Sequence, residues 1–381
     1  MNIGVLNSGG DSPGLNAVIE GVVGAASRRG WNVVGFYDGF EGLLSEEGDE
    51  RFEWLTPAAC RGLRAKGGTI LGTVNKGNFA IKVGVDQKGA IEPAVLEKTK
   101  ATVRRLGLDA LIVVGGDGSQ STALLLSEIG LPVVGVPKTI DNDLGATDVT
   151  FGFYSAVSIV SESLDRLETT ANAHQRMMVV EVMGRHAGWI ALEGGIAGSA
   201  DVILLPEIPF SLENVVECIK ARKAAGQREI LVVVSEGARL ADELVLLDEK
   251  TQGEVRLGGI GKVIAKKLEE ATGIETRSCV LGHIQRGGSP CSYDRILGTR
   301  FGSYAVELVE KRQFSCMVAL RGTQMTAVPI EEAVKTLKLV DPDCQLVRTA
   351  RDLGVCFGTE FLSSREPEVR TARDLGVCFG D

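Results

Sequence analysis

DALIVVGGDGSQSTALLLSEIG, residues 109–130, joins a continuous apolar run to a glycine-rich turn and then to a segment with helical periodicity. Unbroken runs of Val, Ile and Leu are typical of strands that are buried on both faces, as in parallel sheets. The same order recurs along the chain, from NIGVL at 2–6 to SCVL at 278–281. Strands that alternate with helices indicate βαβ units. We predict a two-lobed, doubly wound α/β fold with mostly parallel sheets and helices on both faces.

Composition excludes several classes of protein. The 381 residues are 44% hydrophobic, which is enough for one large or two medium domains. A net charge of −9 without any basic run argues against binding to nucleic acid or to a membrane surface. The eight cysteines form no CxxC pair, so neither a zinc site nor a disulfide framework is expected. No apolar run approaches the roughly 20 residues of a membrane span, and no signal peptide is evident, so we expect a cytoplasmic protein.

We expect every polar motif of the chain to lie where one of these strands ends, because ligands bind beyond the carboxyl ends of the strands in such sheets. SGGDSPGLN at 8–16 and GGDGS at 115–119 both lie between a predicted strand and a predicted helix. Their glycines allow close approach of a ligand, and the helix that follows offers free N–H groups to phosphate. A carboxylate at Asp117 suits such a loop if Mg²⁺ lies between it and the phosphates. A simple capping turn is the alternative for either loop alone.

The stretch PKTIDND at 137–143 combines a cation with two acids. Lys138 can meet a phosphate as a point charge, and Asp141 can accept a proton from a hydroxyl nucleophile. An acidic surface turn is the alternative. We expect Lys138 and Arg185 to lower the pKa of Asp141, which leaves a weak base; a loose transition state needs little deprotonation of the nucleophile.

Taken together and in this order, the motifs resemble the phosphofructokinase family over roughly residues 1–335. The resemblance rests on seven stretches at similar spacing, namely GGDSPGLNAVI (9–19), GGDGS (115–119), PKTIDND (137–143), HQR (174–176), MGRHAG (183–188), LLPE (204–207) and LGHIQRGGSP (281–290). It implies transfer of a phosphoryl group to the 1-hydroxyl of fructose 6-phosphate, with Mg²⁺.

The resemblance also implies a role for individual residues. Asp141 is the general base, and Thr139 and Arg185 steady the transferring group, so these three are the catalytic candidates. The phosphoryl donor is held by Gly10, Gly116, Asp117, Gly118, Ser119 and Lys138, with Asp117 nearest the metal. Asn75 and Lys76 also belong to the donor site, although Asn75 stands where bacterial members of the family carry an arginine. The sugar phosphate is bound by Thr139, Asp141, Met183, Gly184, Arg185, Glu236, His283 and Arg286, and by Arg176 and Arg277. In this family the last two come from a neighbouring subunit, which implies a homo-oligomer, either dimer or tetramer.

The motifs also suggest how the chain is divided. We predict a phosphoryl-donor lobe from 1–152 with 285–335, and a sugar-phosphate lobe from 153–284. A C-terminal segment follows at 336–381, in which VRTARDLGVCFG occurs at 347–358 and again at 369–380. Two copies are too few for a stacked repeat. A recent duplication or a sequence artefact is one explanation and an extra interface segment is another, so no role is assigned.

Two positions bear on the phosphoryl donor. Members of the family that use ATP usually have glycine at the position of Gly118, where a carboxylate would crowd and repel an α-phosphate. Lys138 points the other way, because pyrophosphate users have lysine there and many bacterial ATP users have glycine. The combination also occurs in one ATP-using branch of the family. We expect ATP, with a pyrophosphate-dependent phosphotransferase as the alternative. A kinase of another acceptor and a non-catalytic sugar-phosphate sensor are further alternatives.

Overall fold

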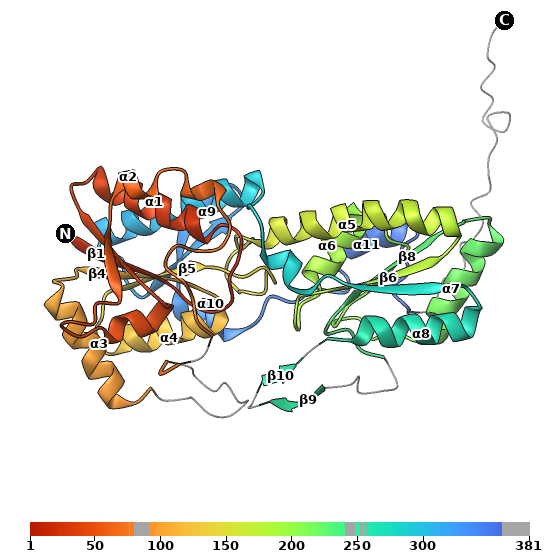
Figure 1. Cartoon of the computed structure of the whole chain (residues 1–381), viewed down its shortest axis with the longest axis horizontal. Helices are drawn as coiled ribbons and strands as arrows, with labels where there is room; N and C mark the ends of the chain where they lie inside the picture. Colours follow the sequence, from red (N-terminus) through yellow and green to blue (C-terminus); the bar gives the residue numbers. More distant parts are fainter. Residues whose placement is uncertain (76, 80–90, 241–247, 252–253, 257, 360–381) are drawn as a thin grey trace, which may run out of the picture.

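The computed structural model describes residues 1–75, 77–79, 91–240, 248–251, 254–256 and 258–359, and it has two lobes side by side (Figure 1). The first lobe is built on a seven-stranded sheet of order β13-β12-β5-β4-β1-β2-β3. Its central strands run parallel, whereas the edge strands β3 and β13 run antiparallel to their neighbours. The strands are β1 (Asn2–Asn7), β2 (Asn32–Phe36), β3 (Phe52–Leu55), β4 (Ala110–Gly115), β5 (Val133–Pro137), β12 (Cys316–Arg321) and β13 (Gln324–Pro329).

Helices cover both faces of this sheet. They are α1 (Leu15–Ser27), α2 (Pro57–Cys60), α3 (Pro93–Arg105), α4 (Asp117–Glu128), α9 (Ser292–Glu310) and α10 (Ile330–Lys335), with short 3₁₀ turns η1 (Gly39–Leu44) and η2 (Leu63–Ala65).

The second lobe has a four-stranded, all-parallel sheet of order β11-β6-β8-β7. Its strands are β6 (Met177–Val182), β7 (Val202–Leu204), β8 (Ile230–Ser235) and β11 (Thr276–Val280). Around it are α5 (Phe153–His174), α6 (Trp189–Ala197), α7 (Leu212–Ala224), α8 (Ile260–Thr272) and α11 (Gln345–Asp352); η3 (Gly282–Arg286) follows β11, and β9 (Asp248–Thr251) pairs with β10 (Glu254–Arg256). The predicted fold class is therefore confirmed.

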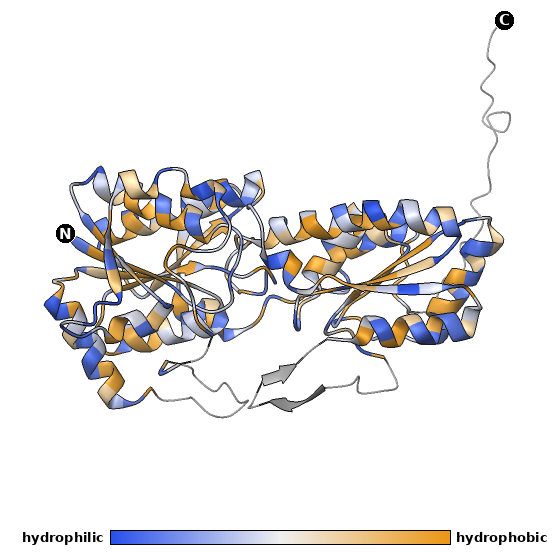
Figure 2. Ribbon diagram, in the orientation of Figure 1, coloured by the Kyte–Doolittle hydropathy of each residue, from blue (hydrophilic) through white to orange (hydrophobic). Residues whose placement is uncertain are grey.

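The apolar runs form strands because each strand has a core on both of its faces. In β4, Ile112 and Val114 join the cluster with α1 and α9, whereas Leu111 and Val113 join the cluster with α4 on the opposite face. Figure 2 shows the apolar colour concentrated on the strands and on the inner sides of the helices. Burial of both faces explains why the sequence of β4 shows no alternation.

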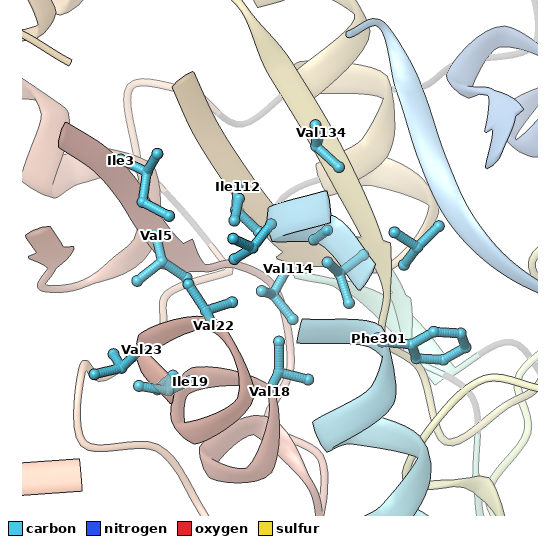
Figure 3. Packing of buried hydrophobic residues seen from close by; sticks show 14 of the residues in the cluster. Ile3, Val5, Val18, Ile19, Val22, Val23, Ile112, Val114, Val134 and Phe301 are labelled. Carbon is cyan, nitrogen blue, oxygen red and sulfur yellow. The ribbon is translucent and has the colours of Figure 1, made fainter. Parts of the chain in front are cut away.

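Helices α1 and α9 approach each other closely through glycine. A Cβ atom at Gly302 would lie 2.3 Å from the carbonyl oxygen of Val18, and one at Gly21 would lie 2.5 Å from that of Thr299. Figure 3 shows Val18 and Val22 of α1 and Phe301 of α9 in the core that these helices share with the sheet. This contact fixes α1, which follows the first polar loop.

The C-terminal part of the described chain crosses between the lobes. Helix α10 packs on α4 in the first lobe, whereas Val340 and α11 belong to a core cluster of the second lobe (Figure 1). The lobe boundaries predicted from the sequence stay a prediction. The second copy of the repeat, at 369–380, lies outside the described residues. Within the described ranges, no helix is both long and apolar enough to cross a membrane.

Candidate active site

Three polar loops share one edge of the seven-stranded sheet. They follow β1, β4 and β5, which are neighbours in the sheet, so their carboxyl ends lie side by side. Backbone hydrogen bonds join them in pairs: the amide of Ser8 donates to the Val114 oxygen at 2.9 Å, and that of Lys138 donates to the Gly115 oxygen at 3.0 Å. The chain reverses its winding direction between β1 and β4, which is where doubly wound sheets bind ligands.

Lys138 lies under the first two loops. Its side chain is buried, and its ammonium group donates to the carbonyl oxygen of Gly10. A Cβ atom at Gly9 would lie 3.3 Å from this ammonium nitrogen and 3.4 Å from the Ser119 hydroxyl. Burial, and secondly the charge of Arg286, lower the pKa of Lys138 to about 8. The lysine therefore holds loop one against loop two and places positive charge under both.

The second loop opens helix α4. Gly116 is its N-cap residue, and Asp117 and Gly118 lie exposed in its first turn. A Cβ atom at Gly118 would meet nothing within 4 Å, and its φ is not in the left-handed region. The fold itself therefore does not require glycine at 118, and the residue there is free to serve a ligand.

Asp141 is buried near the cationic side chains of Arg286, Arg185 and Lys138. The residue is 4% exposed, and its Oδ1 atom has no hydrogen-bond partner among the described residues. Burial raises the pKa of Asp141, and this effect exceeds the lowering by the charges of Arg286, Arg185 and Lys138. The lowered pKa predicted from the sequence is therefore wrong in direction, because the sequence showed the cations but not the burial.

Asp143 adds a second buried acid to the same turn. The pKa of Asp143 is raised to about 7, mainly by burial and secondly by the negative charges of Asp141 and Asp117. A hard divalent cation prefers carboxylate oxygens and is often held by one or two of them together with substrate phosphates. The exposed carboxylate of Asp117 and the unpartnered Oδ1 of Asp141 fit Mg²⁺ in that way. In the described part of the chain, no group of three or more His, Cys, Asp or Glu side chains could hold a metal by itself.

The second lobe contributes the turn that follows β6. Arg185 has φ 53° and its amide donates to Glu236 Oε1 at 3.1 Å. Burial raises the pKa of Glu236 to about 7, and the Asp141 charge contributes. The amide of Met183 faces Gln285 Oε1 at 3.4 Å. Met183, Gly184, Arg185 and Glu236 are thus grouped on the side of the second lobe that faces Asp141.

Arg286 connects the two halves of the site. It ends η3, and its guanidinium donates to the Asp11 carbonyl oxygen at 3.0 Å. A Cβ atom at Gly10 would lie 3.1 Å from the same guanidinium, so a larger residue at position 10 would displace it. His283 lies exposed on η3, one turn before Arg286.

The structure does not bring Arg176 and Arg277 to this site within one chain. Arg176 precedes β6 and Arg277 is near the start of β11, so both lie at the amino ends of these strands. The expectation that every polar motif follows a strand is therefore wrong for HQR at 174–176. Glu275 pairs with both arginines, at 2.7 Å from Arg176 Nε. The two cations form one cluster, remote from Asp141.

One of the two donor-site predictions from the stretch after Val74 lies beside the first loop. The carbonyl oxygen of Val74 accepts from the amide of Gly9 at 3.3 Å, which places the exposed Asn75 next to loop one. Lys76 lies outside the described residues. Thr139 is buried, and its hydroxyl accepts from the amide of Asp141 at 3.1 Å, so it shapes the turn that carries Asp141.

Sequence reasoning missed Lys338. Its ammonium group donates to Asn142 Oδ1 at 2.8 Å, although the two residues are 196 positions apart. No motif, spacing or periodicity near 338 indicates this contact, because it depends on how the C-terminal segment crosses the molecule. Asn142 and Asp143 were visible in the PKTIDND motif but received no role.

The fold and the site define a class of two-lobed α/β proteins in which glycine loops, cations and a buried carboxylate suit phosphoryl transfer. A profile described as Phosphofructokinase matches residues 2–309. An ATP-dependent 6-phosphofructokinase of Chloroflexus aggregans is 51% identical over 360 residues, covering 94% of this chain and 98% of that protein. One from Spirochaeta thermophila is 47% identical, covering 93% and 97%.

Solved structures agree. Pichia pastoris phosphofructokinase in the T-state superposes with a TM-score of 0.76 at 32% identity, over 92% of this chain and 36% of that one. A pyrophosphate-dependent phosphofructokinase from Marinobacter aquaeolei has a TM-score of 0.74 at 24% identity, over 93% and 91%, which shows the fold alone. The chain belongs to the phosphofructokinase family, as the sequence resemblance predicted.

Proposed function

We propose that this chain is an ATP-dependent 6-phosphofructokinase, which transfers a phosphoryl group from MgATP to the 1-hydroxyl of fructose 6-phosphate and forms fructose 1,6-bisphosphate. The observation that carries the proposal is Asp141, a buried carboxylate with an unpartnered oxygen. It lies between phosphate loops of one lobe and the Arg185 turn of the other. The names of the curated relatives, at 47–51% identity, support the donor and the acceptor.

The donor belongs on the first lobe. The turn from 116–119 offers backbone N–H groups at the opening of α4, and Gly10 lies in the loop that leads into α1. Asp117 would hold Mg²⁺ there, and the cation would offset the negative charge of the donor phosphates. Asn75 and Lys76 complete the proposed donor site.

The acceptor belongs between the lobes, where Asp141 takes the proton of the 1-hydroxyl. Burial raises the pKa of Asp141, and the raised pKa makes Asp141 a stronger base than an ordinary carboxylate. Thr139 and Arg185 steady the transferring group, and Arg185 brings positive charge to oxygens that gain charge in the transition state. Met183, Gly184 and Glu236 hold the sugar ring, while His283 and Arg286 bind its phosphate.

We also propose that the sites are shared in a homo-oligomer, dimer or tetramer. Arg176 and Arg277 lie far from Asp141 in their own chain, so they would bind the sugar phosphate of a neighbouring subunit. A phosphate that carries about two charges near neutral pH suits several arginines. A cytoplasmic location completes the proposal, because both substrates are highly charged, and cell fractionation with an activity assay would test it.

The sequence predicts ATP as the phosphoryl donor and keeps pyrophosphate as the alternative. Lys138 favoured pyrophosphate there, but in the structure its ammonium group is engaged with the Gly10 carbonyl. A lysine with this role holds a loop whichever donor is bound. The open space at Gly118 leaves room for an α-phosphate, which favours ATP.

The test is an assay of fructose 1,6-bisphosphate formation from fructose 6-phosphate and Mg²⁺, with ATP in one series and pyrophosphate in another. Turnover with ATP alone supports the proposal. Turnover with pyrophosphate alone would replace it by the pyrophosphate-dependent reaction. Binding of fructose 6-phosphate without turnover by either donor would identify a sugar-phosphate sensor instead.

The variant Gly118→Asp tests the role of position 118. The protein has room for the new side chain, so the fold is preserved, but its carboxylate would repel the α-phosphate. We expect kcat/KM for ATP to fall by about 100-fold or more, which corresponds to about 2.7 kcal/mol or more. Gly24→Asp, at an exposed position of α1, is a matched control outside the site, since a Cβ atom there also meets nothing within 4 Å and its φ is not in the left-handed region either. Unchanged kinetics with ATP in Gly118→Asp would refute this role.

A further inference from the structure

Lys338 lies in the segment 336–344, which leaves α10 in the first lobe and enters α11 in the second (Figure 1). The family profile ends at residue 309, so it does not include this segment. The side chain is nevertheless half-buried beside the loop that carries Asp141.

In the first lobe, Lys338 holds the turn of residues 141–148. Its ammonium group donates to Asn142 Oδ1 at 2.8 Å, to the Thr147 oxygen at 3.2 Å and to the Asp148 oxygen at 2.8 Å. Its backbone amide donates to the Asp143 oxygen at 2.8 Å. An ammonium group has three donors, and all of them are used here.

Asn142 is the residue through which this contact reaches the base. It lies between Asp141 and Asp143 with φ 53°, a left-handed conformation that is unfavourable for residues other than glycine, although asparagine tolerates it best. Its Oδ1 atom accepts from the Thr150 amide at 3.1 Å as well as from Lys338. These donors hold the side chain, and with it the backbone turn that aims Asp141.

In the second lobe, the same segment holds the turn that carries Arg185. The carbonyl oxygen of Lys338 accepts from Trp189 Nε1 at 2.8 Å, and its ammonium lies 5.7 Å from the centre of that ring. Glu207 Oε1 accepts from two amides, Val340 at 2.9 Å and Gly188 at 2.8 Å. Trp189 and Gly188 follow Arg185 by only four and three residues.

We infer that Lys338 is a positioning residue that fixes Asp141 relative to Arg185 by joining the turns of the two lobes. The kinetic consequence of this inference rests on the proposed function, whereas the contacts do not. Lys338 touches neither substrate in that proposal. It acts through Asn142 on one side and through Trp189 on the other.

The charge of Lys338 has a defined pH range. Burial lowers its pKa to about 8, and the carboxylates that face it, Asp148, Asp143 and Glu193, oppose that shift. The ammonium form is therefore present at neutral pH and is lost as the pH rises through about 8. Deprotonation removes one N–H donor from the three contacts with residues 142–148.

The kinetic test compares Lys338→Met with Lys335→Met, a control in which an exposed lysine three residues earlier is changed in the same way. We expect Lys338→Met to lower kcat by about 10- to 100-fold, since displacement of reacting groups by about 1 Å can cost about 100-fold. The KM values for both substrates should change by less than about threefold. The wild-type kcat should decline above about pH 8, and the decline should be shallower in Lys338→Met, where only Lys138, whose pKa is also about 8, still loses its charge in that range.

A double-mutant cycle tests whether Lys338 acts through Asn142. If it does, Asn142→Ala combined with Lys338→Met should lose little more activity than the more damaging single variant. Additive losses would overturn that route. Equal kcat in wild type and Lys338→Met would overturn the inference as a whole.

Hydrogen exchange provides a readout that does not depend on turnover. Amides in 141–150 and 185–190 should exchange faster in Lys338→Met than in the wild type, and their exchange should be unchanged in Lys335→Met. Unchanged exchange in both segments would overturn the inference even if the enzyme is active. If exchange is faster in Lys338→Met but the wild type never phosphorylates fructose 6-phosphate, the positioning role of Lys338 is supported and the proposed function is refuted. The two failures are therefore distinguishable.

Discussion

Asp141 and Asp143 share one turn, with Asn142 between them, and both of their carboxyl groups are buried. Buried acids with raised pKa values bind protons in the folded state that they would release in the unfolded chain. Such groups favour folding at low pH and oppose it at high pH. The burial that would make Asp141 a stronger base at neutral pH therefore also lowers the stability of the folded protein as the pH rises.

We predict from Asp143 that the free enzyme becomes less stable as the pH rises. The folded-state pKa of Asp143 is raised to about 7 from an ordinary value of 3.8, so its contribution is complete below the ordinary value and is lost as the pH rises through about 7. One proton accounts for at most about 1.4 kcal/mol per pH unit. The midpoint of thermal unfolding without ligands should fall between about pH 4 and pH 7, the interval between the two pKa values.

Asp143→Asn removes this titrating group while keeping its shape, and it should flatten the decline. Glu193 and Glu236 have pKa values raised to about 7 for the same reason, so part of the decline should persist. An equally steep decline in Asp143→Asn would show that Asp143 does not titrate in this range.

At the scale of elements, the pair α1–α9 positions the donor loop. Loop one leads directly into α1, and α1 lies against α9 so closely that Gly302 has no space for a side chain. Glycine at this position reflects helix packing, since nothing near it belongs to the phosphate loops.

We predict that Gly302→Ala destabilises the first lobe. The added methyl group would lie 2.3 Å from the Val18 oxygen, so the helices must separate. Overpacking of this kind typically costs about 1–3 kcal/mol. Ser303→Ala, at an exposed position of the same helix, should change stability by less than about 0.5 kcal/mol. Urea unfolding followed by circular dichroism measures both variants, and equal midpoints would contradict the packing argument.

At the scale of the whole molecule, one chain does not bring together all the residues of the proposed sugar-phosphate site. Arg176 and Arg277 are paired with Glu275 at the amino ends of β6 and β11. Asp141 follows β5 of the first lobe, and it interacts with Arg185, which follows the carboxyl end of β6. In the shared site that we propose, a second copy of the chain would bring these cations to Asp141.

We predict complementation between two inactive variants. In a mixed dimer of Asp141→Asn and Arg277→Ala chains, one site combines both defects and the other has neither. Such dimers, purified through two different tags, should regain about half of the wild-type specific activity. Each variant alone should remain impaired. No recovery in the mixed dimer would mean that the sites are not shared through Arg277.

The sequence by itself determined the alternation of strands and helices, the loops at 8–16, 115–119 and 137–143, and the family. These are local features, because periodicity and glycine spacing are read within a few residues. Only the tertiary structure decided the direction of the pKa shift at Asp141, the remote position of Arg176 and the contact of Lys338 with Asn142. Burial and contacts between distant residues depend on how the two lobes pack, and no local pattern in the chain encodes them.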